Sequence, residues 1–229
     1  EVIAYGKNND FIFEQEAVVL YAFLMLHLNN KSTTAWNIIR NSDLDHKKSP
    51  LAAFALANLA MQTGRNAEAI TILLQRPKSP KYYPFPYLDF MLGLAKLRRL
   101  DEDAEKYLKK FVQNFHGQNY IKEAYQKLAW AELLKGNPVG YNQFMKFCQK
   151  EGHTIVESDK SALKEAKAKN LPNIILLKAR LLFDGGYYQK AYDLLKDKTY
   201  ADFVDLKSQL EFNYRLGRIA HQLRLKKHH

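Results

Sequence analysis

The stretch 181–195, LLFDGGYYQKAYDLL, places an acidic residue, two glycines and two tyrosines between apolar runs. Asp-Gly-Gly occurs in phosphate or metal loops and also at the tight corner between two antiparallel helices. A lone Asp-Gly-Gly lacks the spacing of a phosphate loop, so Asp184 is expected to be a solvated or groove-lining residue. We expect Gly186 to take a left-handed conformation that ends one helix, and Tyr187 and Tyr188 to start the next.

The other residues with chemical potential do not form a recognisable site. None of the seven histidines forms a His-x-x-x-His pair or lies in a ligand spacing with Cys148, the single cysteine. The sequence also lacks Gly-x-Ser-x-Gly, Walker and Gly-x-Gly-x-x-Gly patterns. Cys148 is expected to be a small buried residue on the apolar side of a helix. We therefore predict no enzyme, with no catalytic residue, no metal and no cofactor.

The composition indicates a folded, helical and basic protein. The chain has 229 residues, of which 47% are hydrophobic and only ten are glycine. Its net charge of +11 favours anionic partners, but the 35 basic residues are dispersed and are expected to form a solvated surface. The longest apolar run, Ala17 to Leu26, is too short to span a bilayer. A soluble protein is predicted, and the compartment, cytoplasmic or periplasmic, is left open.

An internal repeat is the strongest signal in the sequence. Starting from GGYYQKAYDLL, a glycine or a substitute for it is followed about five residues later by a small residue and then by an apolar one. This middle position falls at residues 35, 69, 104, 141 and 191, with successive steps of 34, 35, 37 and 50 residues. Three steps near 34 and one longer step indicate a repeat with one insertion.

Each corner is preceded by a second helical pattern with apolar residues at spacings of three and four. Small residues recur near the middle of these segments, where helices must approach closely: Ala57, Gly93, Ala129 and Ala179. A sixth copy, LEFNYRLGRIAHQLRL, contains the Leu216-Gly217 pair. The sequence therefore predicts at least ten main helices.

These residues resemble the tetratricopeptide repeat family, which has 34 residues and two antiparallel helices per unit. The resemblance covers nearly the whole chain, and its matching residues are Leu56-Ala57, Gly64, Ala69, Leu92-Gly93, Ala104, Leu128-Ala129, Gly136, Ala179, Gly186 and Ala191. It implies an all-α fold in which antiparallel helix pairs stack into a right-handed superhelix. We expect about five repeats and a partial sixth in a single domain over residues 1–229.

Two stretches interrupt the repeat. Residues 75–87 carry four prolines and are expected to form an extended connector, whose aromatic residues pack on adjacent helices: Tyr82, Tyr83, Phe85 and Tyr87. Residues 149–172 account for the 50-residue step. There we expect an extra short helix, capped at its start by Ser158 or Asp159.

The family resemblance also implies a function, which is binding along the concave face of the superhelix. The inward positions are Phe54, Asn58, Met61, Tyr87, Phe90, Arg98, Gln126, Trp130, Arg180, Phe183, Tyr214 and Arg218. Aromatic residues with scattered arginines suit a protein or peptide that has apolar anchors and some negative charge. The other interpretation is that these aromatics only fill a tightly wound interior.

Two other binding functions, recognition of a terminal carboxylate and binding of RNA, are less well supported by the sequence. The terminal-carboxylate clamp of the family has only Glu123 and Lys127 at its places in the fourth unit, so that set is incomplete. RNA binding through the basic surface is the alternative function, but helical-repeat RNA readers need a repeated polar code where this chain has apolar residues. We therefore do not expect nucleic acid as the partner.

The C-terminal helix raises the question of self-association. Its apolar residues Phe212, Leu216, Ile219 and Leu223 are expected to exceed what the preceding helix pair can cover. Either the array continues, so that this chain is a fragment of a longer one, or the edge packs on a second molecule. Continuation is favoured, because RLGRIA is typical of the middle of an array.

Overall fold

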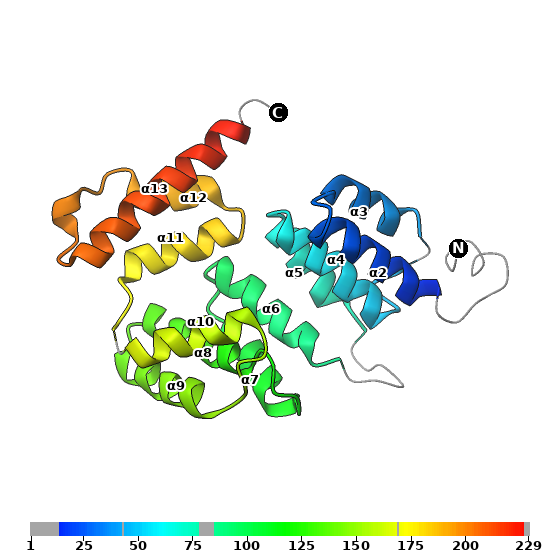
Figure 1. Cartoon of the computed structure of the whole chain (residues 1–229), viewed down its shortest axis with the longest axis horizontal. Coiled ribbons are helices and arrows are strands. Elements are labelled where there is room, and N and C mark those ends of the chain that lie inside the picture. The colour runs from blue at the N-terminus through cyan, green and yellow to red at the C-terminus, as the bar shows by residue number, and fades with distance from the viewer. Residues whose placement is uncertain (1–13, 43, 78–84, 169, 227–229) are drawn as a thin grey trace. The chain divides into compact units, whose positions relative to one another are not determined.

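The computed structural model describes residues 14–42, 44–77, 85–168 and 170–226, and these residues form α-helices, one short 3-10 helix and no strand. The first helices of the successive pairs are α2 (Glu14–His27), α4 (Pro50–Gln62), α6 (Tyr87–Arg98), α8 (Ile121–Leu134) and α11 (Ile174–Asp184). The second helices are α3 (Ser32–Arg40), α5 (Asn66–Gln75), α7 (Ala104–Asn114), α9 (Pro138–Lys150) and α12 (Tyr188–Leu195). The chain also forms α10 (Glu157–Ala168), η1 (Tyr200–Asp202) and α13 (Leu206–Lys226). The all-α prediction and the helix count are thus confirmed (Figure 1).

The chain divides into two compact units, Glu1–Leu92 and Gly93–His229. In the first unit, α2 packs on α3, α4 packs on α5, and α4 also contacts α2 and α3. In the second unit, α8 packs on α7, α9 and α10, and α11 packs on α8, α12 and α13. Because α6 runs through the boundary, the single domain expected from the sequence stays a prediction.

Each helix pair turns at a residue with positive φ. These corner residues are Asn30, Gly64, Leu100, Gly136 and Gly186, with φ between 52° and 79°. After the last four, the next backbone amide donates to the carbonyl five residues earlier, as from Tyr187 to Leu182 at 2.9 Å. The left-handed conformation predicted for Gly186 is confirmed, and Tyr188 starts α12. The small-residue positions that follow are buried: Ala35, Ala69, Ala104, Tyr141 and Ala191.

Side chains at the helix starts explain where several helices begin. Ser49, Asn137 and Asn173 each accept a hydrogen bond from a backbone amide in the first turn of α4, α9 and α11. Proline occupies the first turn of α4 and α9, where its missing amide hydrogen is not needed. Helix α8 differs, because its cap residue Tyr120 is left-handed and makes no side-chain cap of its own.

The inserted helix α10 supplies the missing cap of α8. The carboxylate of Asp159 is completely buried and accepts hydrogen bonds from the backbone amides of Tyr120 at 2.7 Å and Glu123 at 3.0 Å. The extra helix expected within 149–172 is confirmed. The expectation that Ser158 or Asp159 caps that helix itself is wrong, because α10 begins at Glu157 and the Asp159 carboxylate serves a helix 36–39 residues away.

A buried lysine links the start of α8 to the end of α9. Lys122, in the first turn of α8, donates from Nζ to the carbonyl oxygens of Cys148 at 3.0 Å, Gln149 at 3.2 Å and Glu151 at 3.0 Å. These carbonyls lie at the end of α9, where no intrahelical amide is available to them. Lys122 therefore ties the end of α9 to the start of α8.

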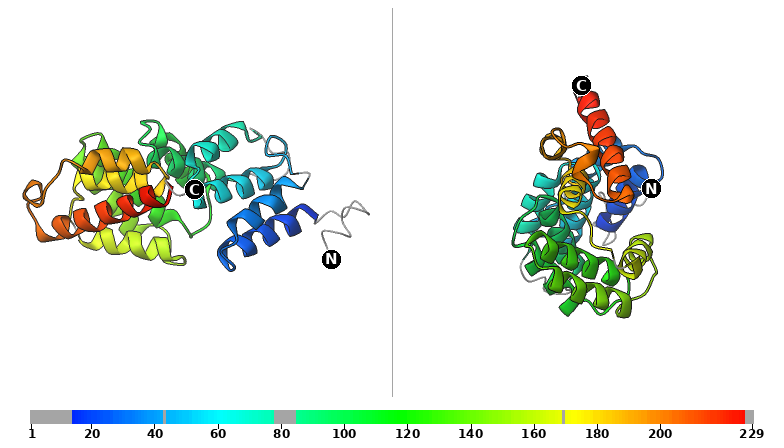
Figure 2. Two further views of the ribbon diagram at one scale, coloured as in Figure 1. Left: turned by 90° about the horizontal axis from the view of Figure 1, so that it is seen from above. Right: turned by 90° about the vertical axis from the view of Figure 1, so that its left-hand side faces the viewer.

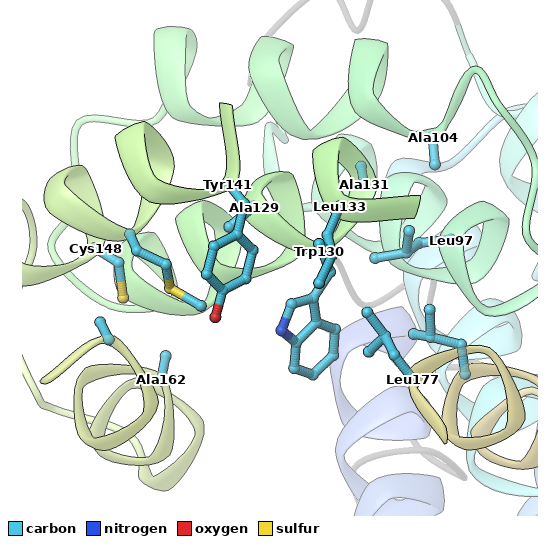
Figure 3. Packing of buried hydrophobic residues seen from close by; sticks show 13 residues of the cluster. Leu97, Ala104, Ala129, Trp130, Ala131, Leu133, Tyr141, Cys148, Ala162 and Leu177 are labelled. Carbon is cyan, nitrogen blue, oxygen red and sulfur yellow. The ribbon is translucent and has the colours of Figure 1, made fainter. Parts of the chain in front are cut away.

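The core of the second unit surrounds α8 (Figure 3). Cys148 is fully buried in this core, as expected from the sequence, beside residues of α8 and α10. Burial raises the pKa of the Cys148 thiol to about 12. A smaller core joins α11, α12 and α13, which lie side by side in Figure 2 (yellow to red).

The expectation for the C-terminal edge needs correction. Phe212 and Ile219 are buried, at 4% and 0% exposure, because α13 packs on both α11 and α12. Leu216 and Leu223 are half-buried against the same core. Among the described side chains of α13, the large apolar residues that are exposed are instead Leu206, Leu210 and Tyr214.

In the first unit, part of the proline-rich connector can be followed. The ring of Phe54 lies 5.6 Å from that of Phe85 and 5.9 Å from that of Tyr87, measured between centroids. The expected packing of Phe85 and Tyr87 on a neighbouring helix is therefore confirmed. Tyr82 and Tyr83 lie outside the described residues.

Candidate functional site

A cleft of about 580 Å³ in the second unit is the best candidate for a binding site. We call it the Trp130 cleft, and it is formed by α8, α10, the connector before α11, α11 itself and the start of α13. Its lining residues are Trp130, Glu165, Asn170, Leu171, Pro172, Asn173, Leu177, Arg180, Asp205, Lys207, Ser208 and Glu211. Its walls mix apolar, amide and charged side chains, a composition suited to a polypeptide segment.

The insertion creates this cleft. Helix α10 packs on both α8 and α9, while α11 packs on α8 and on its own partner α12. The connector that carries the chain from α10 to α11 forms one edge of the cleft through Asn170, Leu171, Pro172 and Asn173. Asn173 is fixed there because its side chain caps α11, accepting from the amides of Ile175 and Leu176.

Trp130 forms the floor of the cleft. It is only 1% exposed, and its indole Nε1 donates to Glu165 Oε1 at 2.7 Å. Gln126 Nε2 donates to the other oxygen of Glu165, also at 2.7 Å. Figure 3 shows Trp130 beside Leu177, with the indole nitrogen turned away from that leucine. Both oxygens of Glu165 are thus engaged in holding α8 to α10.

Cations gather around the Trp130 ring. Lys127 Nζ lies 3.9 Å and Arg180 Cζ 4.6 Å from the ring centroid, within the range of a cation–π attraction. Lys127 also donates to Gln126 Oε1 at 2.7 Å and pairs with Glu123 at 3.5 Å. Burial lowers the pKa of Lys127, although the carboxylates of Glu123 and Glu165 act in the opposite direction.

Arg98 belongs to the same charged group. Burial lowers the pKa of its guanidinium, while the carboxylates of Asp184 and Glu123 act in the opposite direction. Lys127 interacts electrostatically with both Arg98 and Arg180. The structure therefore brings together four of the residues predicted from the sequence: Arg98, Gln126, Trp130 and Arg180.

Three further predicted residues form a separate cluster on α11 and α13. Arg218 Nη1 donates to the hydroxyl of Tyr214 at 2.9 Å, and its Cζ lies 5.3 Å from the centroid of the Phe183 ring. Phe183 in turn packs against Tyr188, with centroids 5.1 Å apart. Tyr214 and Arg218 are exposed, so this cluster is accessible from solvent.

The five predicted residues of the first unit lie on α4 and α6. Tyr87 stacks on Phe90 with centroids 5.5 Å apart, and Phe54 contacts Tyr87. Asn58 Nδ2 is 3.5 Å from Nε2 of His27, and Met61 is buried. Phe54, Tyr87 and Phe90 form an aromatic cluster within their own unit.

Burial separates the twelve predicted residues into two groups. Met61, Phe90, Gln126 and Trp130 are 8%, 2%, 4% and 1% exposed, so their side chains belong to the interior. Tyr214 and Arg218 are exposed, and the remaining six are half-buried: Phe54, Asn58, Tyr87, Arg98, Arg180 and Phe183. A role of the twelve in partner binding stays a prediction, in which the buried members support the accessible ones.

The sequence did not single out several residues of the cleft. Glu165 lies on the inserted helix, outside the repeat register, and its signal is its place between the buried Ala162 and Ala166. The sequence marks Lys127 only as part of the incomplete carboxylate clamp. Leu171 and Lys207 line the cleft because of the path that the chain takes in three dimensions, and no local sequence pattern indicates this.

The described residues contain neither a candidate metal site nor a candidate membrane-spanning helix. Within them, no group of three or more His, Cys, Asp or Glu side chains is arranged to hold a metal ion. Nor is any helix of residues 14–226, within the described ranges, both long and apolar enough to cross a bilayer. No protein-family model, no curated protein and no solved structure matches the chain.

Proposed function

We propose that this protein is a non-catalytic scaffold that binds a segment of a partner protein in the Trp130 cleft. In this proposal the helix pairs are tetratricopeptide-like units that stack into a right-handed superhelix. The recurring left-handed corners and the buried small residues that follow them support this arrangement. The cleft itself is the observation that carries the binding function.

The charges of the cleft indicate the chemistry of the bound segment. Its acidic residues are engaged within the chain: Glu165 as described, Asp205 by the amide and hydroxyl of Ser208, and Glu211 by Arg215 at 2.6 Å. Arg180 is 38% exposed at its side chain, and its acidic neighbour Asp184 is 3.9 Å away.

The lining also exposes a cation and an apolar side chain to a partner segment. Lys207 is exposed, and the side chain of Leu171 offers an apolar surface at 52% exposure. Charge complementarity then favours a segment that places an acidic side chain beside an apolar anchor. The bound segment is accordingly a partner's peptide rich in Asp or Glu with at least one large apolar residue.

Selection from a random peptide library displayed on phage tests this proposal. Selected peptides should combine acidic and large apolar residues, and they should bind the double variant Arg180→Glu/Lys207→Glu at least about tenfold more weakly, a change of about 1.4 kcal/mol. The control is Lys146→Glu/Lys190→Glu, which makes the same charge change at exposed sites on α9 and α12. Equal binding to both double variants would refute the proposal.

RNA binding remains the second candidate, because the net charge is +11. Titration with single-stranded RNA over a range of salt concentrations distinguishes it. Tight binding with a steep salt dependence, weakened equally by both double variants, would replace peptide binding by a diffuse basic surface. Turnover of a small molecule would overturn both candidates.

A further inference from the structure

In four of the five helix pairs, the internal register of the repeats defines a small residue that is covered by a neighbouring helix, whereas in the first pair the equivalent residue is Phe23, which is 42% exposed. Ala57, Gly93, Ala129 and Ala179 each precede a corner residue by seven positions. The three alanines are completely buried. At Gly93 a Cβ atom would come within 2.7 Å of the Leu108 side chain and 3.0 Å of the Leu108 backbone nitrogen. Helix α7 therefore packs directly on the backbone of α6 at this point.

The covering helices share a simple sequence pattern. In three of the four pairs, the second helix presents a buried alanine followed four residues later by a buried leucine: Ala69 and Leu73, Ala104 and Leu108, Ala191 and Leu195. In a helix, residues four apart lie on one face. An Ala-x-x-x-Leu face is thus what this chain itself packs against the small residue of a first helix.

Gly217 on α13 has the same local sequence, but no helix in the described part of the second unit covers it. Like Gly93 it follows a leucine, yet it is exposed, and a Cβ atom built on it would meet nothing within 4 Å. A glycine inside a helix destabilises it by about 1 kcal/mol relative to alanine. Leu206 and Leu210 lie on the same side of α13 by helical spacing and are 67% and 57% exposed. The opposite side is buried against α11 and α12.

We propose that this face of α13 docks an amphipathic helix of a partner protein, which lies over Gly217 as α7 lies over Gly93. The partner helix carries an Ala-x-x-x-Leu face and acidic side chains along its flanks. The acidic flanks follow from Arg218 and Arg224, which are exposed next to and one heptad beyond Gly217. This docking surface goes beyond the Trp130 cleft, because it uses a different side of α13.

The probe is a synthetic peptide of residues 101–115 with Lys106→Glu, Lys109→Glu and Lys110→Glu. It keeps the Ala104 and Leu108 face of α7 and replaces three exposed lysines by acidic residues. Calorimetric titration should show binding to the full chain, and the unmodified peptide should bind more weakly because its lysines face the arginines of α13.

Two variants at one position separate docking from folding. Gly217→Ala keeps the small side chain found at the equivalent positions and should bind the probe within about threefold of the wild type. Gly217→Leu fills the space that the partner needs and should weaken binding at least about tenfold. Both substitutions favour the helix, and their Cβ atoms meet nothing, so neither loses binding through unfolding.

Three outcomes would overturn the docking proposal. The first is no binding of the probe by the wild type at hundreds of micromolar, and the second is equal binding by Gly217→Leu. The third is a concentration-dependent dimer in sedimentation that Gly217→Leu abolishes, since the occupant would then be a second copy of this chain. The double variant Arg180→Glu/Lys207→Glu should bind the probe as tightly as the wild type does. Loss of probe binding in this variant would show that the probe binds in the Trp130 cleft instead.

Discussion

Replacing Asp159 tests whether the inserted helix α10 stabilises the helix pair beside it. Asp159→Ala removes a carboxylate that accepts two backbone hydrogen bonds, from Tyr120 and Glu123, and takes this acceptor from two half-buried amides. Hydrogen bonds to a charged group each contribute about 1.5–3 kcal/mol, and loss of a helix cap costs about 0.5–2 kcal/mol.

The net effect is smaller than two full charged hydrogen bonds. Burial raises the pKa of Asp159, because desolvation of the charged carboxylate outweighs the two amide hydrogen bonds that favour it. Part of the interaction is therefore offset in the folded wild type. We expect Asp159→Ala to lower the free energy of unfolding by about 2–3 kcal/mol, and Asp159→Asn, which keeps one acceptor, by about 1–2 kcal/mol.

Urea unfolding followed by circular dichroism measures both changes, provided that the slope against urea stays constant. The control is Glu157→Ala on the same helix, whose side chain is 81% exposed and pairs with Lys160. It should change stability by less than about 0.5 kcal/mol. If Asp159→Ala is as mild as Glu157→Ala, the cap does not stabilise α8 and the reasoning fails.

Three further changes test the packing and the buried polar groups. Ala69→Leu and Ala191→Leu should each overpack a helix crossing and destabilise the fold by about 1–3 kcal/mol, and unchanged urea midpoints would contradict the repeat register. Lys122→Met should destabilise by about 1–3 kcal/mol, because three carbonyls at the end of α9 lose their donor; a variant with wild-type stability would show that water replaces the ammonium. The pKa of Cys148 rises from 9.0 to about 12 on folding, so the folded chain keeps a proton that the unfolded chain loses, and stability falls as the pH rises above 9. Cys148→Ala should lack this loss, which totals about 1.4 kcal/mol between pH 8 and 10, and parallel stability curves over that range would disprove it.

The sequence allowed the helix corners to be predicted because they depend on local conformation. Glycine is the residue that tolerates positive φ, and its recurrence at 64, 136 and 186 marked the pattern. Leu100 adopts the same conformation without being glycine, so its residue type did not mark it as a corner. The burial of Cys148 followed in the same way from its place on the apolar side of a helix.

What could not be predicted depends on contacts between distant segments. Asp159 has the sequence context of a local cap, and nothing nearby indicates that its carboxylate serves the start of α8 instead. The Trp130 cleft arises because α10 occupies the surface of α8 and α9, which no single repeat encodes. Phe212 and Ile219 are covered because α13 contacts two helices at once, an arrangement set by the tertiary path of the chain.

The cap supplied by Asp159 also has a consequence for synthesis on the ribosome. The backbone amide of Tyr120 donates to the carboxylate of Asp159, which lies 39 residues downstream and is therefore synthesised later. At about 5–20 residues per second, the ribosome needs several seconds to translate that interval. During this time α8 is synthesised with an open helix start, and α9, which ends at Lys150, is completed before the helix that covers both. Slowing translation between residues 120 and 159 would lengthen the exposure of this nascent hairpin to chaperones and proteases.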